Sequence, residues 1–445
     1  MFITVILFAI SYTNAARFLQ LTDIHYDRDY SAQWGNVVEK CHRKTGVPRS
    51  KLGQYGNYAC HSPKSLIRNM LAAAKKVISN PDFVFWTGDS VSHLDNSNNE
   101  THVLKELQVV SDMVANTFPQ AKILPVFGIH DSAPAGAFPD RNCSLYNNET
   151  FLKGGYYKYQ APNNMMILAL NTNLYYKFNR AIPTFANSDD PAEQFNFMQE
   201  TLNEAQRQQR VVHVIAHTAP GAFERIPNFT WMLPKYNKRF IQLTIRYARV
   251  IKWMLFGHHH TDTFHVVKDP KTNRAMQVYL LAPAVTPWFG NLENSGSNNP
   301  SFRVFDYDSN NKELLDVKTY YVDLNQLNKN ASTQWQLEYS MAQAYGISKI
   351  FDCSIDSELH RCDNRLAYLF RSDAINANTM SNALNQMKTD DETFRKYIEY
   401  NTVRWNYSIP TGKFRGAQLC SMEYVDFALY KSCMSNWTST VAAGF

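Results

Sequence analysis

The chain has 445 residues, of which 44% are hydrophobic and 19% are charged, and its formal net charge is +6. This composition is typical of an ordinary globular protein and excludes a low-complexity chain, and the length allows one large core with a smaller second unit. The basic residues form no continuous tract, so a nucleic-acid duplex is not expected as the main partner.

The N-terminus predicts secretion. Residues 2–10 are apolar and are followed by small residues up to Ala15 and Ala16, so we expect a removed signal peptide over residues 1–16. Asparagine sequons agree with an extracellular, glycosylated protein. They begin at Asn99, Asn142, Asn148, Asn228, Asn330, Asn406 and Asn436.

The seven cysteines favour disulfides over thiol chemistry. Spacing suggests the pairs Cys41–Cys60, Cys353–Cys362 and Cys420–Cys433, with Cys143 left single inside the Asn142 sequon. No later apolar run is long enough for a membrane span, and the C-terminus lacks the hydrophobic tail of a lipid-anchor signal. We therefore expect a soluble, secreted monomer.

Three strand patterns in the first third of the chain each end in polar residues. The strand that begins at Arg17 ends in Asp23 and His25, the one that begins at Asp82 ends in Gly88-Asp89, and the one that begins at Lys122 ends in Gly128-Ile129-His130-Asp131. Amphipathic helices are expected between them, over residues 62–77 and 103–114.

The middle of the chain repeats this arrangement. A buried strand over 165–170 and a helix over 195–205 precede the strand 211–216, which ends in His217. The next strand, 250–256, runs into Gly257 and three histidines, His258 to His260. Because alternate residues of an extended segment face the same way, His258 and His260 can converge while His259 points elsewhere.

Strands are also expected over 277–281, 301–307 and 314–322, the last two joined by an Asn-Asn turn. The strand and helix alternation followed by antiparallel strands predicts an α/β (α+β) fold with a two-sheet core flanked by helices. From about residue 325 the pattern becomes helical. The expected organisation is a signal peptide (1–16), a catalytic domain (17–324) and a helical C-terminal subdomain (325–445).

Five strand ends thus bring together carboxylates and imidazoles, which predicts a single pocket. Ligands of open α/β sheets bind where the strands end. Two converging imidazoles suit zinc, iron or manganese far better than calcium or magnesium. A lone histidine is usually structural, but five coincidences at equivalent positions indicate a metal centre.

The motif order D-x-H, G-D, G-x-H-D, H and G-H-x-H resembles that of the calcineurin-like metallophosphoesterases. The segments Trp86–His93, Ala284–Trp288 and Asn299–Phe305 narrow the resemblance to acid sphingomyelinase-like phosphodiesterases. The resemblance implies a four-layer αββα sandwich that holds two zinc ions between its sheets. It implies that Asp23, His25 and His260 bind one ion, that His217 and His258 bind the other, and that Asp89 bridges both.

The same resemblance implies that His130 protonates the leaving oxygen while Asp131 holds its ring, and that His93 contacts the substrate. It gives His259 no role. One position departs from the family, which has an asparagine ligand where this chain has Ile129. A hydrocarbon can neither coordinate a cation nor donate a hydrogen bond, so the second ion would keep three protein ligands.

The expected function is that of a secreted, zinc-dependent phosphodiesterase that hydrolyses phosphodiester or nucleotide phosphoanhydride bonds through a hydroxide bridging two metals, with activity weakened by Ile129. A catalytically inactive relative that acts as a secreted binding glycoprotein is one alternative. A sphingomyelin phosphodiesterase is another. Because Asp23 follows the signal almost directly, no lipid-extracting saposin domain is expected before the core, which favours a small soluble substrate.

Overall fold

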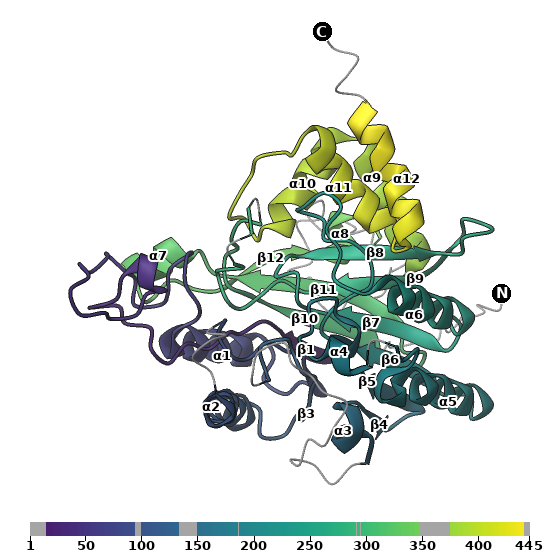
Figure 1. Ribbon diagram of the computed structural model, residues 1–445, viewed down its shortest axis with the longest axis horizontal. Coiled ribbons are helices and arrows are strands. Elements are labelled where there is room, and N and C mark those ends of the chain that lie inside the picture. Colours follow the sequence, from purple (N-terminus) through teal and green to yellow (C-terminus); the bar gives the residue numbers. More distant parts are fainter. Residues whose placement is uncertain are drawn as a thin grey trace, which may run out of the picture.

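The computed structural model describes residues 15–93, 99–132, 149–185, 187–290, 292–293, 295–347 and 374–439. Two six-stranded sheets form its centre (Figure 1). The first sheet has the order β12-β11-β10-β1-β2-β3. Its strands are β1 (Ala15–Leu21), β2 (Phe83–Trp86), β3 (Lys122–Pro125), β10 (Ser301–Asp308), β11 (Leu314–Tyr321) and β12 (Gln336–Ser340).

The second sheet has the order β4-β5-β6-β7-β9-β8. Its strands are β4 (Tyr157–Ala161), β5 (Met165–Ala169), β6 (Val211–Ile215), β7 (Ile251–Phe256), β8 (Thr263–Lys268) and β9 (Ala275–Leu281). In the first sheet β1, β2 and β3 run parallel, and in the second β5, β6 and β7 do so. Each sheet therefore presents three consecutive carboxyl ends at one edge.

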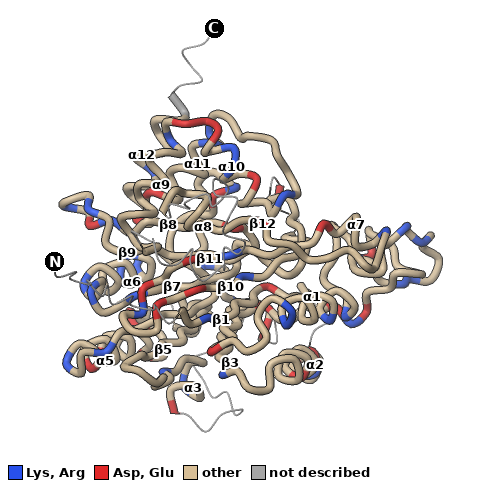
Figure 2. The backbone as a smooth tube through the Cα atoms, turned by 180° about the vertical axis from the view of Figure 1, so that it is seen from behind, with Lys and Arg blue, Asp and Glu red and all other residues tan. Residues whose placement is uncertain are grey.

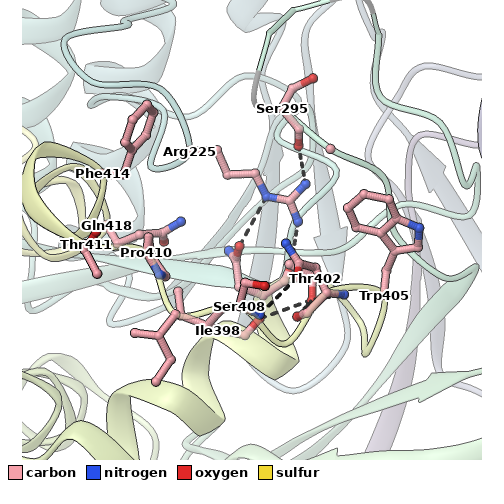
Figure 3. Close-up of a pocket in the computed structure, with 14 residues that line it drawn as sticks. Arg225, Ser295, Ile398, Thr402, Trp405, Ser408, Pro410, Thr411, Phe414 and Gln418 are labelled. Carbon is pink, nitrogen blue, oxygen red and sulfur yellow. Dashed lines mark hydrogen bonds between the residues drawn. The ribbon is translucent and has the colours of Figure 1, made fainter.

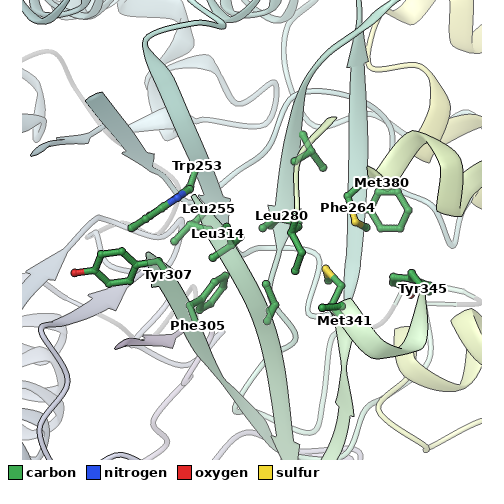
Figure 4. Packing of buried hydrophobic residues seen from close by; sticks show 14 of the residues in the cluster. Trp253, Leu255, Phe264, Leu280, Phe305, Tyr307, Leu314, Met341, Tyr345 and Met380 are labelled. Atoms are coloured by element: carbon green, nitrogen blue, oxygen red, sulfur yellow. The ribbon is translucent and has the colours of Figure 1, made fainter. Parts of the chain in front are cut away.

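The main hydrophobic core lies between the two sheets (Figure 4). Phe18 of β1 stacks on Trp253 of β7 with ring centroids 4.9 Å apart and on Phe305 of β10 at 4.4 Å. All three side chains are buried, so aromatic contacts join the sheets across their inner faces. The same core continues through Met341 and Tyr345 to Met380 at the C-terminal helices.

Helices cover the outer face of each sheet. The helices α1 (Lys64–Val77) and α2 (Glu100–Thr117) pack on the first sheet through one apolar cluster. The helices α5 (Gln194–Arg207) and α6 (Pro234–Arg246) pack on the second sheet through another. The layers follow the order helix, sheet, sheet, helix, which confirms the αββα sandwich expected from the sequence.

The C-terminal helices pack against the edge of the second sheet that carries β8 and β9 (Figure 1). They are α9 (Ala377–Thr389), α10 (Asp391–Asn401), α11 (Gly412–Glu423) and α12 (Phe427–Ser439). The shorter helical elements are η1 (Val37–Glu39), α3 (Glu149–Gly154), η2 (Thr172–Tyr175), α4 (Ile182–Phe185), η3 (Pro191–Glu193), α7 (Leu324–Lys329) and α8 (Met341–Ala344).

Two of the suggested disulfides are present, Cys41–Cys60 and Cys420–Cys433. The first closes the loop before α1, and the second joins α11 to α12. Cys143 and the suggested pair Cys353–Cys362 lie outside the described residues.

Besides the short helices before residue 195, four elements had no counterpart in the sequence analysis: β4, β8, α6 and β12. The strand β12 lies within the region expected to be helical, where it pairs with β11 along the sheet edge. The helix α6 begins at Pro234 and buries Tyr236, Phe240 and Leu243 on one face, a helical periodicity that the sequence analysis did not use. For β12, tertiary packing outweighed local preference.

Basic and acidic residues are interspersed over α5 and the C-terminal helices, whereas α6 carries basic residues alone (Figure 2). Among the described residues, no helix combines the length and the apolar character that crossing a bilayer requires.

Candidate metal centre

The carboxyl edges of the two sheets meet, which brings the five predicted strand ends together. The Gln20 amide of β1 donates to the Phe256 carbonyl at 3.1 Å, and the His217 imidazole contacts the Thr87 carbonyl at 2.7 Å. Each contact joins one sheet to the other. Asp23, Asp89, His130, His217 and His258 therefore surround one site, as the strand-end pattern predicted.

Two glycines permit the close approach of these loops. A Cβ at Gly128 would lie 1.9 Å from the Asp89 backbone nitrogen, and one at Gly257 would lie 2.0 Å from the Thr22 hydroxyl. A side chain at Gly128 would push neighbouring strand ends of the first sheet apart, and one at Gly257 would push the two sheets apart, so only glycine fits there.

Backbone strain is also concentrated at the site. Five non-glycine residues have left-handed φ angles between 45° and 69°. They are Asp23, His25, Asp89, His258 and His260. Such angles are uncommon for residues with a Cβ, and clusters of them mark functional sites that the surrounding fold holds in place.

Asp23, His25 and His260 form the first side of the site. The Nε2 atoms of His25 and His260 lie 3.1 Å apart, and Asp23 Oδ1 lies 3.3 Å from His260 Nε2. All three side chains are buried. The Nδ1–H of His25 donates to the Val91 carbonyl at 2.9 Å, which leaves the Nε2 lone pair directed at its neighbours.

Asp89, His217 and His258 form the second side. Asp89 Oδ2 lies 3.2 Å from His217 Nε2 and 3.6 Å from His25 Nε2, so this carboxylate is shared by both sides. His217 donates its Nδ1–H to a backbone carbonyl, as His25 does. His258 is held by its backbone N–H, which donates to Asp23 Oδ2 at 3.0 Å.

Burial sets the protonation of these groups. It lowers the pKa of His25 to about 3 and the pKa of His258 well below the usual range, so both imidazoles are neutral. Burial would also lower the pKa of His217, but the Asp89 carboxylate raises it to about 9. Burial opposes ionisation of Asp89 too, yet the positive charges of His217 and His130 hold its pKa well below 3.8.

These residues fit a pair of divalent cations. Asp23 Oδ1, His217 Nε2 and His258 Nε2 are buried and have no hydrogen-bond partner within the described part of the chain. Both Asp23–His25–Asp89 and Asp89–His217–His258 have ligand atoms within 4.8 Å of one another. Buried polar atoms without partners are costly unless a cation occupies the space between them.

His130 and His93 lie beside the shared carboxylate. Their rings stack with centroids 3.8 Å apart, and the backbone N–H of His130 donates to Asp89 Oδ1 at 2.8 Å. The Asp131 carboxylate accepts backbone bonds from Gly128 at 2.8 Å and from Ser90 at 2.8 Å. Asp131 thereby fixes the loop that carries His130, and burial raises its pKa to about 6.

Ile129 lies in the chain between Gly128 and His130, which both approach Asp89. A Cβ at Gly128 would overlap Asp89, and the backbone N–H of His130 donates to Asp89 Oδ1. The Ile129 side chain is buried. The residue between these two contacts with Asp89 therefore has a hydrocarbon side chain.

The sequence analysis did not include His61. Its Nε2 accepts the backbone N–H of His93 at 3.1 Å, and its ring lies 5.2 Å from that of His25 and 4.6 Å from that of Trp288. His61 follows Cys60 in a loop rather than a strand, so no strand-end pattern marks it. Its position adjoining the Cys41–Cys60 disulfide was the only available signal.

An aromatic wall borders the second side. Trp231 lies edge-on to His258 with centroids 4.3 Å apart, and Tyr176 lies 5.6 Å from the same ring. Phe178, with half of its surface exposed, extends this wall. The Lys177 ammonium lies 4.7 Å from the centre of the Phe178 ring.

Five of the predicted sequons have described asparagines, and all five side chains are exposed. They are Asn99, Asn228, Asn330, Asn406 and Asn436. Asn142 and Asn148 lie outside the described residues.

Comparisons with known proteins agree with this geometry. The family model "Calcineurin-like phosphoesterase" matches residues 16–262, and "Acid sphingomyelin phosphodiesterase C-terminal region" matches residues 274–361. Acid sphingomyelinase-like phosphodiesterase 3b of Mus musculus is 30% identical over 96% of this chain and 92% of its own length. A cyclic GMP-AMP phosphodiesterase of Rattus norvegicus is 31% identical over 94% of this chain and 91% of its own. Sphingomyelinase phosphodiesterase C of Dictyostelium discoideum is 30% identical over 74% and 78%.

Proposed function

The chain belongs to the calcineurin-like phosphoesterases, and from this premise we propose that it is a secreted phosphodiesterase that binds two zinc ions and hydrolyses a small phosphodiester or nucleotide phosphoanhydride. The observation that carries the proposal is Asp89, whose carboxylate is shared between two groups of buried ligands. The relatives of this chain are phosphoric diester hydrolases, and the chain is assigned to the same enzyme class.

Zinc suits the donor set better than harder cations do. Imidazole nitrogens are the majority donors on both sides of Asp89, and calcium and magnesium prefer oxygen. Asp23, His25 and His260 would hold one ion, and His217 with His258 the other. When bound, the two ions acidify a water, orient the phosphate and neutralise charge as the bond breaks.

The remaining side chains have separate roles. His130 would protonate the departing oxygen, since it lies next to Asp89 at the rim of the site. Asp131 holds the His130 loop through backbone hydrogen bonds. Burial keeps the pKa of His93 well below the usual range, so its neutral ring can contact the phosphate without adding a charge.

The surroundings support a substrate with an aromatic or apolar group. Trp231, Tyr176 and Phe178 line one side of the site, and Lys177 adds a positive charge beside them. A nucleotide offers a ring for such a wall and a phosphate for such a cation. The disulfides and exposed sequons support secretion and glycosylation.

A second candidate function is a secreted binding glycoprotein without turnover, which Ile129 favours because it supplies no donor to the second side. Rates on a nitrophenyl phosphodiester, a nucleoside triphosphate and detergent-dispersed sphingomyelin, each with zinc content, separate the possibilities. We expect two zinc ions and turnover of the first two substrates that chelation removes. Two bound ions with no turnover of any substrate would favour the binding protein, and preference for sphingomyelin would change the substrate class.

A further inference from the structure

His259 points away from the proposed metal centre and into a buried polar cluster. Its Nδ1 lies 2.8 Å from Glu224 Oε2, and both side chains are fully buried. His259 separates His258 from His260 in the chain. A contact that fixes His259 therefore holds the segment between two proposed zinc ligands.

The second carboxylate oxygen of Glu224 contacts Thr261, which follows His260 in the chain. Oε1 accepts the Asn401 amide at 3.0 Å and also the Thr261 hydroxyl. Glu224 thus binds the residues that flank His260 on both sides. Both Glu224 oxygens thus have protein partners, and these contacts make Glu224 a clamp on the segment 259–261.

Arg225 extends the cluster to the loop behind His260 (Figure 3). Its guanidinium donates to Asn298 Oδ1 at 2.7 Å and to the Asn401 carbonyl at 3.1 Å. It also donates to the Ser295 carbonyl. The Asn298 amide in turn donates to the carbonyl of His260, so Arg225 reaches this ligand through one intermediate.

Asn401 connects the cluster to the C-terminal helices. It is the last residue of α10 and is buried. Besides its contacts with Glu224 and Arg225, its carbonyl accepts the backbone N–H of Asp262 at 3.2 Å. Asn401 lies outside both family matches, which end at residues 262 and 361.

We propose that Glu224, Arg225 and Asn401 are positioning residues through which the C-terminal helices hold His258 and His260 in their ligand geometry. This inference rests on the proposed function, because it assumes that these histidines bind zinc. A buried hydrogen-bond network in which each member has a partner holds one arrangement, and the loss of one member leaves others unsatisfied. Outer contacts that orient metal ligands typically change metal affinity about 10–100-fold.

The test compares zinc affinity with stability. Glu224→Gln keeps the shape but removes the charge and an acceptor, and Asn401→Ser shortens the contact from α10. Thr402→Val is the matched control, since the buried Thr402 hydroxyl contacts only backbone atoms of its own segment, including the Ile398 carbonyl at 3.2 Å. Zinc affinity is measured by competition with a chromophoric chelator, and Tm is measured on the zinc-free proteins.

We expect Glu224→Gln and Asn401→Ser to weaken zinc binding about 10–100-fold while Thr402→Val binds zinc as the wild type does. If Glu224→Gln does not fold, Asn401→Ser carries the comparison. Wild-type zinc affinity in both folded variants would overturn the inference and leave the proposed function intact, as would equal weakening in the Thr402→Val control. Absence of zinc from the wild type would overturn the proposed function itself and this inference with it.

Discussion

On one side of Asp89, the Asp23 carboxylate and the His260 imidazole approach within 3.3 Å and His25 lies close to both, whereas the other side has the two imidazoles of His217 and His258, and Ile129 offers no donor. Both sides are buried, and both have a histidine whose tautomer is fixed by a backbone carbonyl. The difference is the number of donors. For the proposed pair of zinc ions, it predicts two sites of unequal affinity around one shared carboxylate.

Removal of the shared ligand Asp89 should abolish both proposed zinc sites. Asp89→Asn takes a charged ligand from both sides, and we expect zinc content to fall from two ions to none and kcat/KM to fall at least about a thousandfold. Elemental analysis and rates on the same sample measure both effects. The buried Asp316 offers a control, because its carboxylate binds Ser340 and Ala342 away from the site. Asp316→Asn should keep both ions.

A substitution of His130 tests the proposed proton donor without removing a proposed metal ligand. His130→Gln removes the proton donor but no proposed ligand, so we expect kcat to fall about 10²–10⁴-fold with zinc content unchanged. The loss should be smaller on a nitrophenyl phosphodiester, whose leaving group needs little protonation. Equal losses on substrates with good and poor leaving groups would contradict the assignment of His130 as the acid.

Chelation measures the difference in affinity between the two proposed zinc sites. Titration of the zinc-loaded protein with a chelator should release the ions in two steps whose affinities differ about 10–100-fold, because one side lacks a donor. Activity should disappear with the first step, since hydrolysis needs both ions. A single release step would show that Ile129 has no effect on affinity.

Ile129→Asn should remove this difference in zinc affinity. The amide adds an oxygen donor to the second side, so we expect the two release steps to merge and kcat/KM to rise by about tenfold. Ile129→Leu is the matched control, because it keeps the volume and adds no donor, and it should behave as the wild type. A fall in activity in Ile129→Asn with full zinc occupancy would mean that the chain has adapted to the hydrocarbon.

The strand ends were predictable because each joins an apolar run to polar residues, three of them through a glycine, as in Phe83–Asp89. The two-sheet fold followed from the alternation of such strands with amphipathic helices. His61 could not be found in this way, since it lies in a loop, from which it contacts His93 and His25. The strand β8 begins directly after the histidine motif and pairs with β9 as an antiparallel hairpin, a local signal that the strand-end pattern did not use.

The sequence alone therefore determined which side chains stand at the strand ends, and its period-2 alternation separated His259 from His258 and His260. The tertiary structure alone decided what His259 faces: a carboxylate 35 residues away, which an asparagine on a C-terminal helix, 177 residues from that carboxylate, also contacts. Periodicity is a property of neighbouring residues and specifies direction. Partners across sheets and helices depend on how distant segments pack, and only the folded chain fixes that.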